Sequence, residues 1–175
     1  TVRQVAASVK IPVSVKISPF HTSPANFAQM LEYAGAAGVV LFNRFYQPDF
    51  NIEVLEASPQ LALSDRSELL LRLRWLAILS PQMRGSLAAT GGVHTTSDVV
   101  KAILAGAHAV QLVSALLRHG PRFVTTLANG LREWLNEHGY EDLHQLRGAM
   151  SHRRCPDPAA FERANYIRIL QTWRL

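Results

Sequence analysis

Four short apolar segments of the sequence each end beside residues that can bind a ligand. Lys16 lies near the end of the first segment, and Asn43 comes just after the second. Gly91-Gly92 follows the third, and Ser114-Ala115 follows the fourth. Ligands of parallel α/β folds bind at the carboxyl ends of the strands, so we expect these residues to share one site.

The glycine pair and the serine have the chemistry of an anion site. Gly91 and Gly92 have no side chain, so their backbone N–H groups can approach an anion closely, and the following helix would add its positive N-terminal end. The Ser114 hydroxyl and the backbone N–H groups of Ser114 and Ala115 can bind the same anion. A tight turn is the alternative explanation for the glycine pair.

The lysine and the asparagine have the chemistry of a site for a planar, electron-rich ligand. A lysine within an apolar strand is costly unless its ammonium group lies at the end of the strand, where it can stabilise negative charge on a ligand. Asn43 can both donate and accept hydrogen bonds with an imide-like ring. The alternatives are a solvent-facing Lys16 and a turn-forming Asn43.

The elements that must carry these residues alternate along the chain. Apolar, β-branched runs predict strands, and apolar residues three and four apart predict helices. We expect strands over residues 11–17, 39–42, 86–89 and 109–113. We expect helices over residues 24–34, 66–79, 96–104 and 122–137, with Ser64 or Asp65 capping the second of them.

This alternation predicts an α/β fold in which parallel (β/α) units form the C-terminal half of a TIM-type (β/α)₈ barrel. An open sheet is the alternative, but it would leave unpaired edges. We assign residues 1–139 to the half-barrel. Residues 140–175 form a helical appendage of the same domain, with helices near 143–150 and 161–173. Because residues 1–5 resemble the middle of a helix, we expect a preceding half, and we expect exposed apolar surface along the first and last strands.

The stretch from Gln47 to Ser64 interrupts the pattern. Prolines and polar residues punctuate it, and a connection of this length is often a functional insertion. Part of it, residues 51–55, can form one arm of a hairpin.

The composition narrows the classes of function. The single cysteine, Cys155, excludes an internal disulfide or a multi-cysteine metal centre within the chain, and the histidines show no helical pair of metal ligands, so we expect no metal. A reducing, cytoplasmic setting is the simplest one. The net charge is +5, but the arginines are mostly dispersed without interleaved aromatic residues, so we expect no nucleic-acid partner. No apolar run is long enough to span a membrane.

Four segments resemble one known family. They read VKISPF from Val15, LFNRF from Leu41, TGGVHTTSDVVKAILAGAHAVQLVSALLRHGP from Thr90 and NEHGYEDLHQLRG from Asn136. Together they are similar to the C-terminal half of the dihydroorotate dehydrogenase family, and closest to its bacterial dihydroorotate dehydrogenase-like branch. The likeness covers most of the chain, chiefly residues 10–150.

The resemblance implies a set of cofactor contacts to flavin mononucleotide (FMN). Lys16 corresponds to the family lysine beside the flavin ring. Gly91 and Gly92 correspond to the loop that binds the FMN phosphate, and Ser114 to a hydroxyl residue on that phosphate. Ser64 lies near the family's Ser-Gly turn against the cofactor.

The resemblance also implies an activity, the FMN-dependent oxidation of dihydroorotate to orotate in pyrimidine biosynthesis. Asn43 corresponds to an asparagine that contacts this dihydropyrimidine-like substrate. The family's catalytic base, a serine or cysteine, comes from the preceding half and has no counterpart here; Cys155 is not assigned that role. We therefore expect this chain to be inactive alone, and we allow for a homodimer.

Three positions depart from the family pattern, and two other functions stay open. Val113 replaces a common glycine, Arg44 replaces a small hydroxyl residue after the asparagine, and Asp65 replaces the glycine after Ser64. The alternatives are a non-catalytic module that binds a phosphorylated ligand and another phosphate-binding barrel enzyme, such as a sugar-phosphate isomerase.

Overall fold

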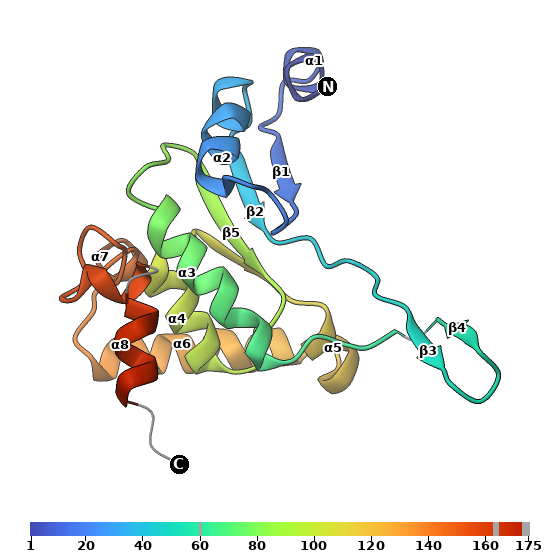
Figure 1. Cartoon of the computed structure of the whole chain (residues 1–175). Coiled ribbons are helices and arrows are strands. Elements are labelled where there is room, and N and C mark those ends of the chain that lie inside the picture. Colours follow the sequence, from blue (N-terminus) through green and yellow to red (C-terminus); the bar gives the residue numbers. More distant parts are fainter. Residues whose placement is uncertain (60, 163–164, 173–175) are drawn as a thin grey trace.

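A four-stranded parallel sheet forms the centre of the molecule, with the strand order β1-β2-β5-β6 (Figure 1). The computed structural model describes residues 1–59, 61–162 and 165–172. The strands are β1 (Ser14–Ile17), β2 (Gly38–Leu41), β5 (Ser86–Thr90) and β6 (Ala109–Gln111). Each lies within or beside one of the four segments predicted as strands, so the parallel sheet is confirmed.

Helices connect the strands and cover the sheet. The chain begins with α1 (Val2–Ser8), as its first residues predict. The helices between the strands are α2 (Pro24–Tyr33), α3 (Leu69–Leu79), which follows the 3₁₀ turn η1 (Arg66–Glu68), and α4 (Thr96–Ala105). The later ones are α5 (Ser114–His119), α6 (Phe123–Glu137), α7 (Leu143–Leu146), the 3₁₀ turn η2 (Pro158–Phe161) and α8 (Asn165–Thr172). None of the helices in the described part of the chain has the length and apolar character that a bilayer crossing requires.

The two faces of the sheet differ in character. Ile17, Leu41 and Ala89 share a register level on one face, and they are buried in the main core with residues of α2, α3 and α4. Lys16 shares a level with Ala109 on the other face, where both are exposed. Parallel sheets are usually covered on both faces, and the interior of a closed barrel provides such a cover.

The exposed residues of the two outer strands are polar or small. Large exposed apolar side chains lie beside these strands instead: Ile11, before β1, is 72% exposed, and Val113, after β6, is 66% exposed. The predicted exposed apolar surface is therefore found at the ends of the outer strands rather than along them.

A second apolar cluster holds the C-terminal part of the chain against α4. Leu127 and Leu146 are buried in it, and Phe123, Leu131 and Trp134 pack against it from one side of α6, as their spacing predicts. Beyond α7, the chain forms hydrogen bonds to the helices that cover the sheet. The N–H groups of residues 148, 150 and 152 donate to carbonyl groups of α4 and α3. These hydrogen bonds attach the chain beyond α7 to the helices that cover the sheet.

Two expected elements differ in the structure. The antiparallel hairpin consists of β3 (Asp49–Asn51) and β4 (Glu56–Ser58), so the prediction of an arm over residues 51–55 is wrong. Residues 52–55 form the turn, because the Asn51 side chain accepts hydrogen bonds from the N–H groups of Glu53 and Val54. The expected last helix, 161–173, is α8 over Asn165–Thr172, with Phe161 in the preceding turn η2 and Trp173 outside the described residues.

Asp98 anchors the N-terminus of α4. Its carboxylate accepts two backbone N–H bonds, from His94 at 3.1 Å and Thr95 at 2.9 Å, and forms a fork with the Arg66 guanidinium at 3.0 to 3.2 Å. Burial alone would raise the pKa of Asp98, but these hydrogen bonds and the nearby charge hold it below its usual value. The carboxylate therefore fixes η1 against α4.

We expect Asp98→Ala to lower the free energy of unfolding at pH 7 by about 1–3 kcal/mol, because it removes a helix cap and a charge-assisted bond. A lowered folded pKa means that Asp98 stabilises the protein above its ordinary pKa of about 3.9, and that this stability is lost as the pH falls through the folded value. Urea unfolding of both proteins between pH 7 and pH 3 should show the difference narrowing at the acid end.

The matched control is Asp157→Ala, which removes an exposed carboxylate without a side-chain capping bond. A difference that stays constant across this pH range would contradict the assignment of the effect to the Asp98 charge.

Candidate functional site

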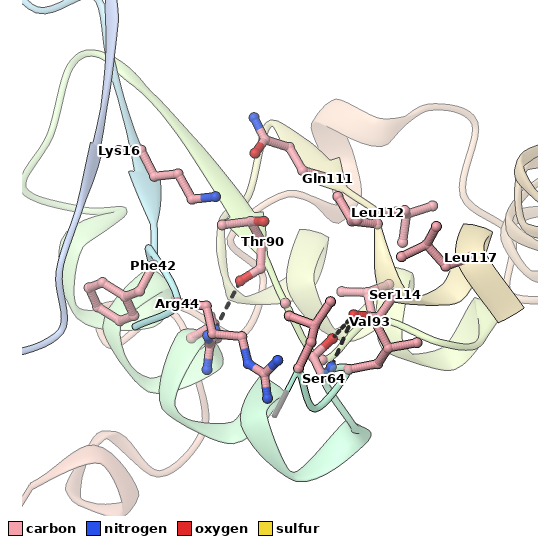
Figure 2. Close-up of a pocket in the computed structure, with 16 residues that line it drawn as sticks. Lys16, Phe42, Arg44, Ser64, Thr90, Val93, Gln111, Leu112, Ser114 and Leu117 are labelled. Atoms are coloured by element: carbon pink, nitrogen blue, oxygen red, sulfur yellow. Dashed lines mark hydrogen bonds between the residues drawn. The ribbon is translucent and has the colours of Figure 1, made fainter. Parts of the chain in front are cut away.

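A cavity of about 240 Å³ opens at the carboxyl ends of the parallel strands (Figure 2). It brings together side chains or backbone from β1, from the turn after β5, from the start of α5 and from the segment before η1. The predicted residues that line it are Lys16, Ser64, Gly91, Gly92 and Ser114. These residues, which are far apart in the sequence, thus meet at one edge of the sheet, where the sequence predicts a shared site.

The other two predicted residues lie outside this cavity. Ala115 is buried and does not line it. Asn43 lines an adjoining cavity of about 270 Å³, together with Phe20 and Phe45. Because Arg44 lines both cavities, the two are neighbouring compartments of one region.

The glycine turn depends on the absence of side chains. Gly91 and Gly92 have φ values of +88° and +81°, which disfavour residues with a Cβ atom. A Cβ atom on Gly92 would lie 2.4 Å from the backbone nitrogen of Leu69, and one on Gly91 would lie 3.0 Å from the Arg72 guanidinium. The turn is therefore packed directly against the start of α3.

The N-terminus of α4 is capped by side chains of the chain itself. The N–H groups of His94 and Thr95 donate to the Asp98 carboxylate, and the Asp98 N–H is paired with the Thr95 hydroxyl. Thr95 and Asp98 thus form a capping box at this helix end. The cavity itself is lined by the glycine turn, by hydroxyl groups and by cationic side chains.

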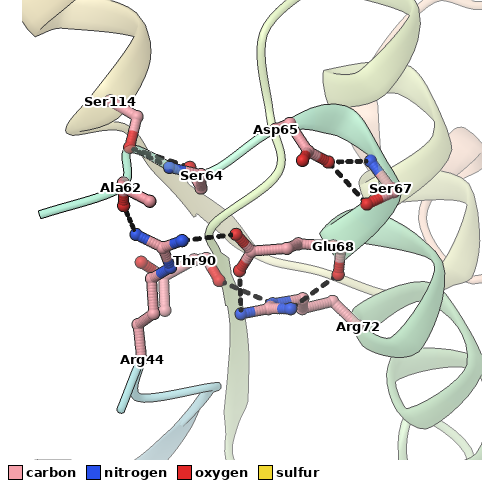
Figure 3. A network of polar contacts seen from close by, with 9 residues as sticks. All are labelled: Arg44, Ala62, Ser64, Asp65, Ser67, Glu68, Arg72, Thr90 and Ser114. Carbon is pink, nitrogen blue, oxygen red and sulfur yellow. Dashed lines mark hydrogen bonds and ion pairs between the residues drawn. The ribbon is translucent and has the colours of Figure 1, made fainter. Parts of the chain in front are cut away.

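Ser64 and Ser114 join two segments that lie far apart in the sequence. The Ser114 hydroxyl oxygen accepts a bond from the Ser64 N–H at 3.0 Å and another from the Ser64 hydroxyl at 2.8 Å (Figure 3). Both lone pairs of this oxygen are then used, so the Ser114 hydroxyl hydrogen is free to donate into the cavity that the residue lines. Within the described residues, this hydrogen has no acceptor.

Three cationic side chains line the cavity: Lys16, Arg44 and Arg72. The lining residues within the described ranges include no carboxylate. Glu68, just outside, is bonded to both guanidinium groups, at 3.2 Å to Arg44 and 3.3 Å to Arg72 (Figure 3). The single negative charge of Glu68 faces the two positive charges of the guanidinium groups, and Lys16 adds a third positive charge. The cavity therefore carries excess positive charge and favours an anion.

Arg72 was not identified from the sequence as a site residue. Its guanidinium donates to the carbonyl groups of Thr90 at 3.0 Å and Glu68 at 2.6 Å. Burial lowers the pKa of Arg72, the Glu68 carboxylate raises it, and an arginine in this setting stays charged. The available signal was an arginine in the apolar run that reads LLLRLRWLAIL, where a charge needs partners.

The structure also places two other residues that depart from the family pattern, Asp65 and Val113. Asp65 caps η1, and hydrogen bonds from the hydroxyl and N–H of Ser67 hold the pKa of Asp65 below its usual value. Ser64, the other candidate cap, is bonded to Ser114 instead. Val113 lines the cavity and is largely exposed. Its side chain therefore lies where a smaller residue would leave the backbone open to a ligand.

The sequence model of one family, described as Dihydroorotate dehydrogenase, matches residues 1–135. The chain belongs to the dihydroorotate dehydrogenase family. Among curated relatives, it is 32% identical over 148 residues to the catalytic subunit of dihydroorotate dehydrogenase B (NAD(+)) from Pelobacter propionicus. It is 30% identical over 149 residues to dihydroorotate dehydrogenase A (fumarate) from Lactiplantibacillus plantarum. Each match covers 82% of this chain and 48% of the relative, so the chain spans about half the length of these dihydroorotate dehydrogenases.

Solved structures of the family share the fold. The crystal structure of DHODH from Eimeria tenella in complex with ferulenol superimposes with a TM-score of 0.65 over 81% of this chain and 39% of the other. The ligand-free form gives 0.62 over 77% of the chain. At 24% and 22% identity, these two likenesses concern the fold, and they confirm the predicted α/β barrel class.

We expect Gly92→Ala to lower the free energy of unfolding by about 3 kcal/mol or more. A Cβ atom would add left-handed backbone strain of roughly 1–2 kcal/mol and an overlap with Leu69. Chemical denaturation measures this change directly.

Gly139→Ala is the matched control, because Gly139 also has a positive φ, of +70°, but has nothing within 4 Å of a new Cβ atom. We expect this variant to lose only about 1 kcal/mol, the cost of the backbone strain. Equal losses in the two variants would show that the close packing of the turn on α3 contributes nothing.

Proposed function

We propose that this chain forms the cofactor-phosphate side of an FMN-dependent oxidoreductase that converts dihydroorotate to orotate, a step of pyrimidine synthesis. The observation that carries the proposal is the cavity at the strand ends. It combines a glycine turn, a hydroxyl donor and three cations in one place. Membership of the dihydroorotate dehydrogenase family supports the same conclusion.

The residues present fit a phosphate-bearing flavin. A phosphate group needs N–H and O–H donors and positive charge. Gly91 and Gly92 leave their backbone open, Ser114 has a free hydroxyl hydrogen, and the excess charge of the cavity is positive. We assign Gly91, Gly92 and Ser114 to the phosphate end of the cofactor, and we assign Ser64, whose N–H and hydroxyl both donate to Ser114, to the positioning of that hydroxyl.

Lys16 and Asn43 are assigned to the reacting end. FMN, when bound, supplies the hydride-accepting ring. Lys16 lies on the exposed face of the sheet and reaches into the cavity, where its ammonium group would stabilise negative charge on a reduced flavin. Asn43 lies in the adjoining cavity, where its amide would orient the substrate ring. The base that removes the substrate proton would come from outside this chain.

The two alternatives are less well supported. A sugar-phosphate isomerase would account for the phosphate site, but not for the match of residues 1–135 to the family. A module that binds a phosphorylated ligand without reaction would use the same cavity. Cofactor binding and turnover by the full-length protein separate these functions.

We expect Ser114→Ala to weaken FMN binding by the full-length protein roughly tenfold, because it removes one charge-assisted hydrogen bond to phosphate. Titration of the cofactor-free protein with FMN, followed by flavin fluorescence, measures the dissociation constant. Riboflavin, which lacks the phosphate, should bind both proteins with similar affinity.

Ser97→Ala on the exposed side of α4 is the control, and it should bind FMN like the unchanged protein. If Ser114→Ala left FMN binding unchanged, or weakened riboflavin binding to the same extent, Ser114 would not contact the phosphate.

A further inference from the structure

Arg44 forms part of the wall between the cofactor cavity and the cavity beside Asn43. It lines the first with Lys16 and Gly91, and the second with Asn43 and Phe20. Because Arg44 and Asn43 line the same cavity, the Arg44 guanidinium lies in the region proposed for the substrate. The chemistry of this group therefore affects which substrate fits.

The positive charges around Arg44 outnumber the negative ones. Glu68 uses one carboxylate oxygen for Arg44, at 3.2 Å, and the other for Arg72, at 3.3 Å. A single carboxylate cannot neutralise two guanidinium groups, so the group of three keeps a net positive charge. A substrate carboxylate would complete the charge balance.

Of the two guanidinium groups, Arg44 is the one that can reach a ligand. The side chain of Arg72 is 7% exposed and is fixed by bonds to two backbone carbonyl groups. The side chain of Arg44 is 42% exposed, and among the described residues its guanidinium is bonded to Glu68 and to the carbonyl group of Ala62 (Figure 3). A small rotation would give a ligand access to its remaining donors.

We propose that Arg44 is a specificity-determining residue that selects ring substrates bearing a carboxylate over neutral rings of the same shape. The inference rests on the proposed function, because it places the substrate in the cavity beside Asn43. Arginine offers two parallel donors to a carboxylate, whereas lysine offers a point charge and glutamine offers none. Glu68 competes with the substrate carboxylate for the same guanidinium, so Glu68 sets the affinity for the anion.

The test compares orotate with uracil, which has the same ring without the carboxylate. Isothermal titration calorimetry on the full-length protein measures both affinities, and the visible spectrum measures flavin content separately. We expect Arg44→Gln to weaken orotate binding by about tenfold or more and to change uracil binding less than about twofold. Arg44→Lys should lie between the two. Arg132→Gln, the same change at an exposed position of α6, should leave both affinities unchanged.

Glu68→Gln distinguishes a ligand contact from a structural brace. It keeps a hydrogen-bond acceptor but removes the competing charge. We therefore expect orotate to bind roughly two- to fivefold more tightly, a change that corresponds to the free energy of one partly exposed ion pair. If the Arg44–Glu68 ion pair only supported the structure, Arg44→Gln and Glu68→Gln would both weaken orotate binding. If Arg44→Gln and Glu68→Gln weakened orotate and uracil alike, the inference would be overturned.

The failure of this inference can be told apart from that of the proposed function. Flavin-loaded protein that binds orotate no better than uracil would overturn the role of Arg44 and leave the cofactor assignment intact. Protein that takes up no flavin, but loses its preference for orotate in Arg44→Gln, would support the role of Arg44 and contradict the proposed redox function.

Discussion

The buried guanidinium of Arg72 needs acceptors for its hydrogen bonds, and the site is arranged around that requirement. Its partners are the last carbonyl of β5, at Thr90, and both the backbone and the side chain of Glu68. These bonds fix the end of β5 against the start of α3, where Gly91 and Gly92 turn with no room for side chains. A buried charge without such partners would be costly, so the same bonds that satisfy Arg72 hold the glycine turn in place.

The sheet explains why residues so distant in sequence can form one site. Its apolar face packs on α2, α3 and α4, and this packing fixes the four strand ends relative to one another. The opposite face carries exposed small and polar residues such as Ser14, Lys16 and Gln111, which suits the interior of a barrel. The helices thus provide stability, while the strand ends provide the ligand-binding groups, a division typical of the barrel family.

The sequence predicts those parts of the fold that depend on residues close together in the chain. Short apolar runs locate the strands, and the glycine pair locates the cavity. The helix α5 was missed because the six residues after Val113 are too few to show a helical period. Asp65 was one of two candidate caps, because Ser64 could have competed for the same N–H groups. The capping box of Thr95 and Asp98 has a spacing that is visible in the sequence, but it was not recognised. The Glu68–Arg72 pair has the i,i+4 spacing that sequence can predict, but the bond of Arg44 to Glu68 joins separate segments, and no spacing rule predicts it.

The central claim is that the cavity at the strand ends holds the phosphate of a flavin. The most direct measurement is the visible absorption spectrum of the purified full-length protein, with the mass of any cofactor released on denaturation. We predict flavin absorption bands and the mass of FMN. A colourless protein that also takes up no added FMN would contradict it, and would leave a barrel whose cationic cavity binds some other anion.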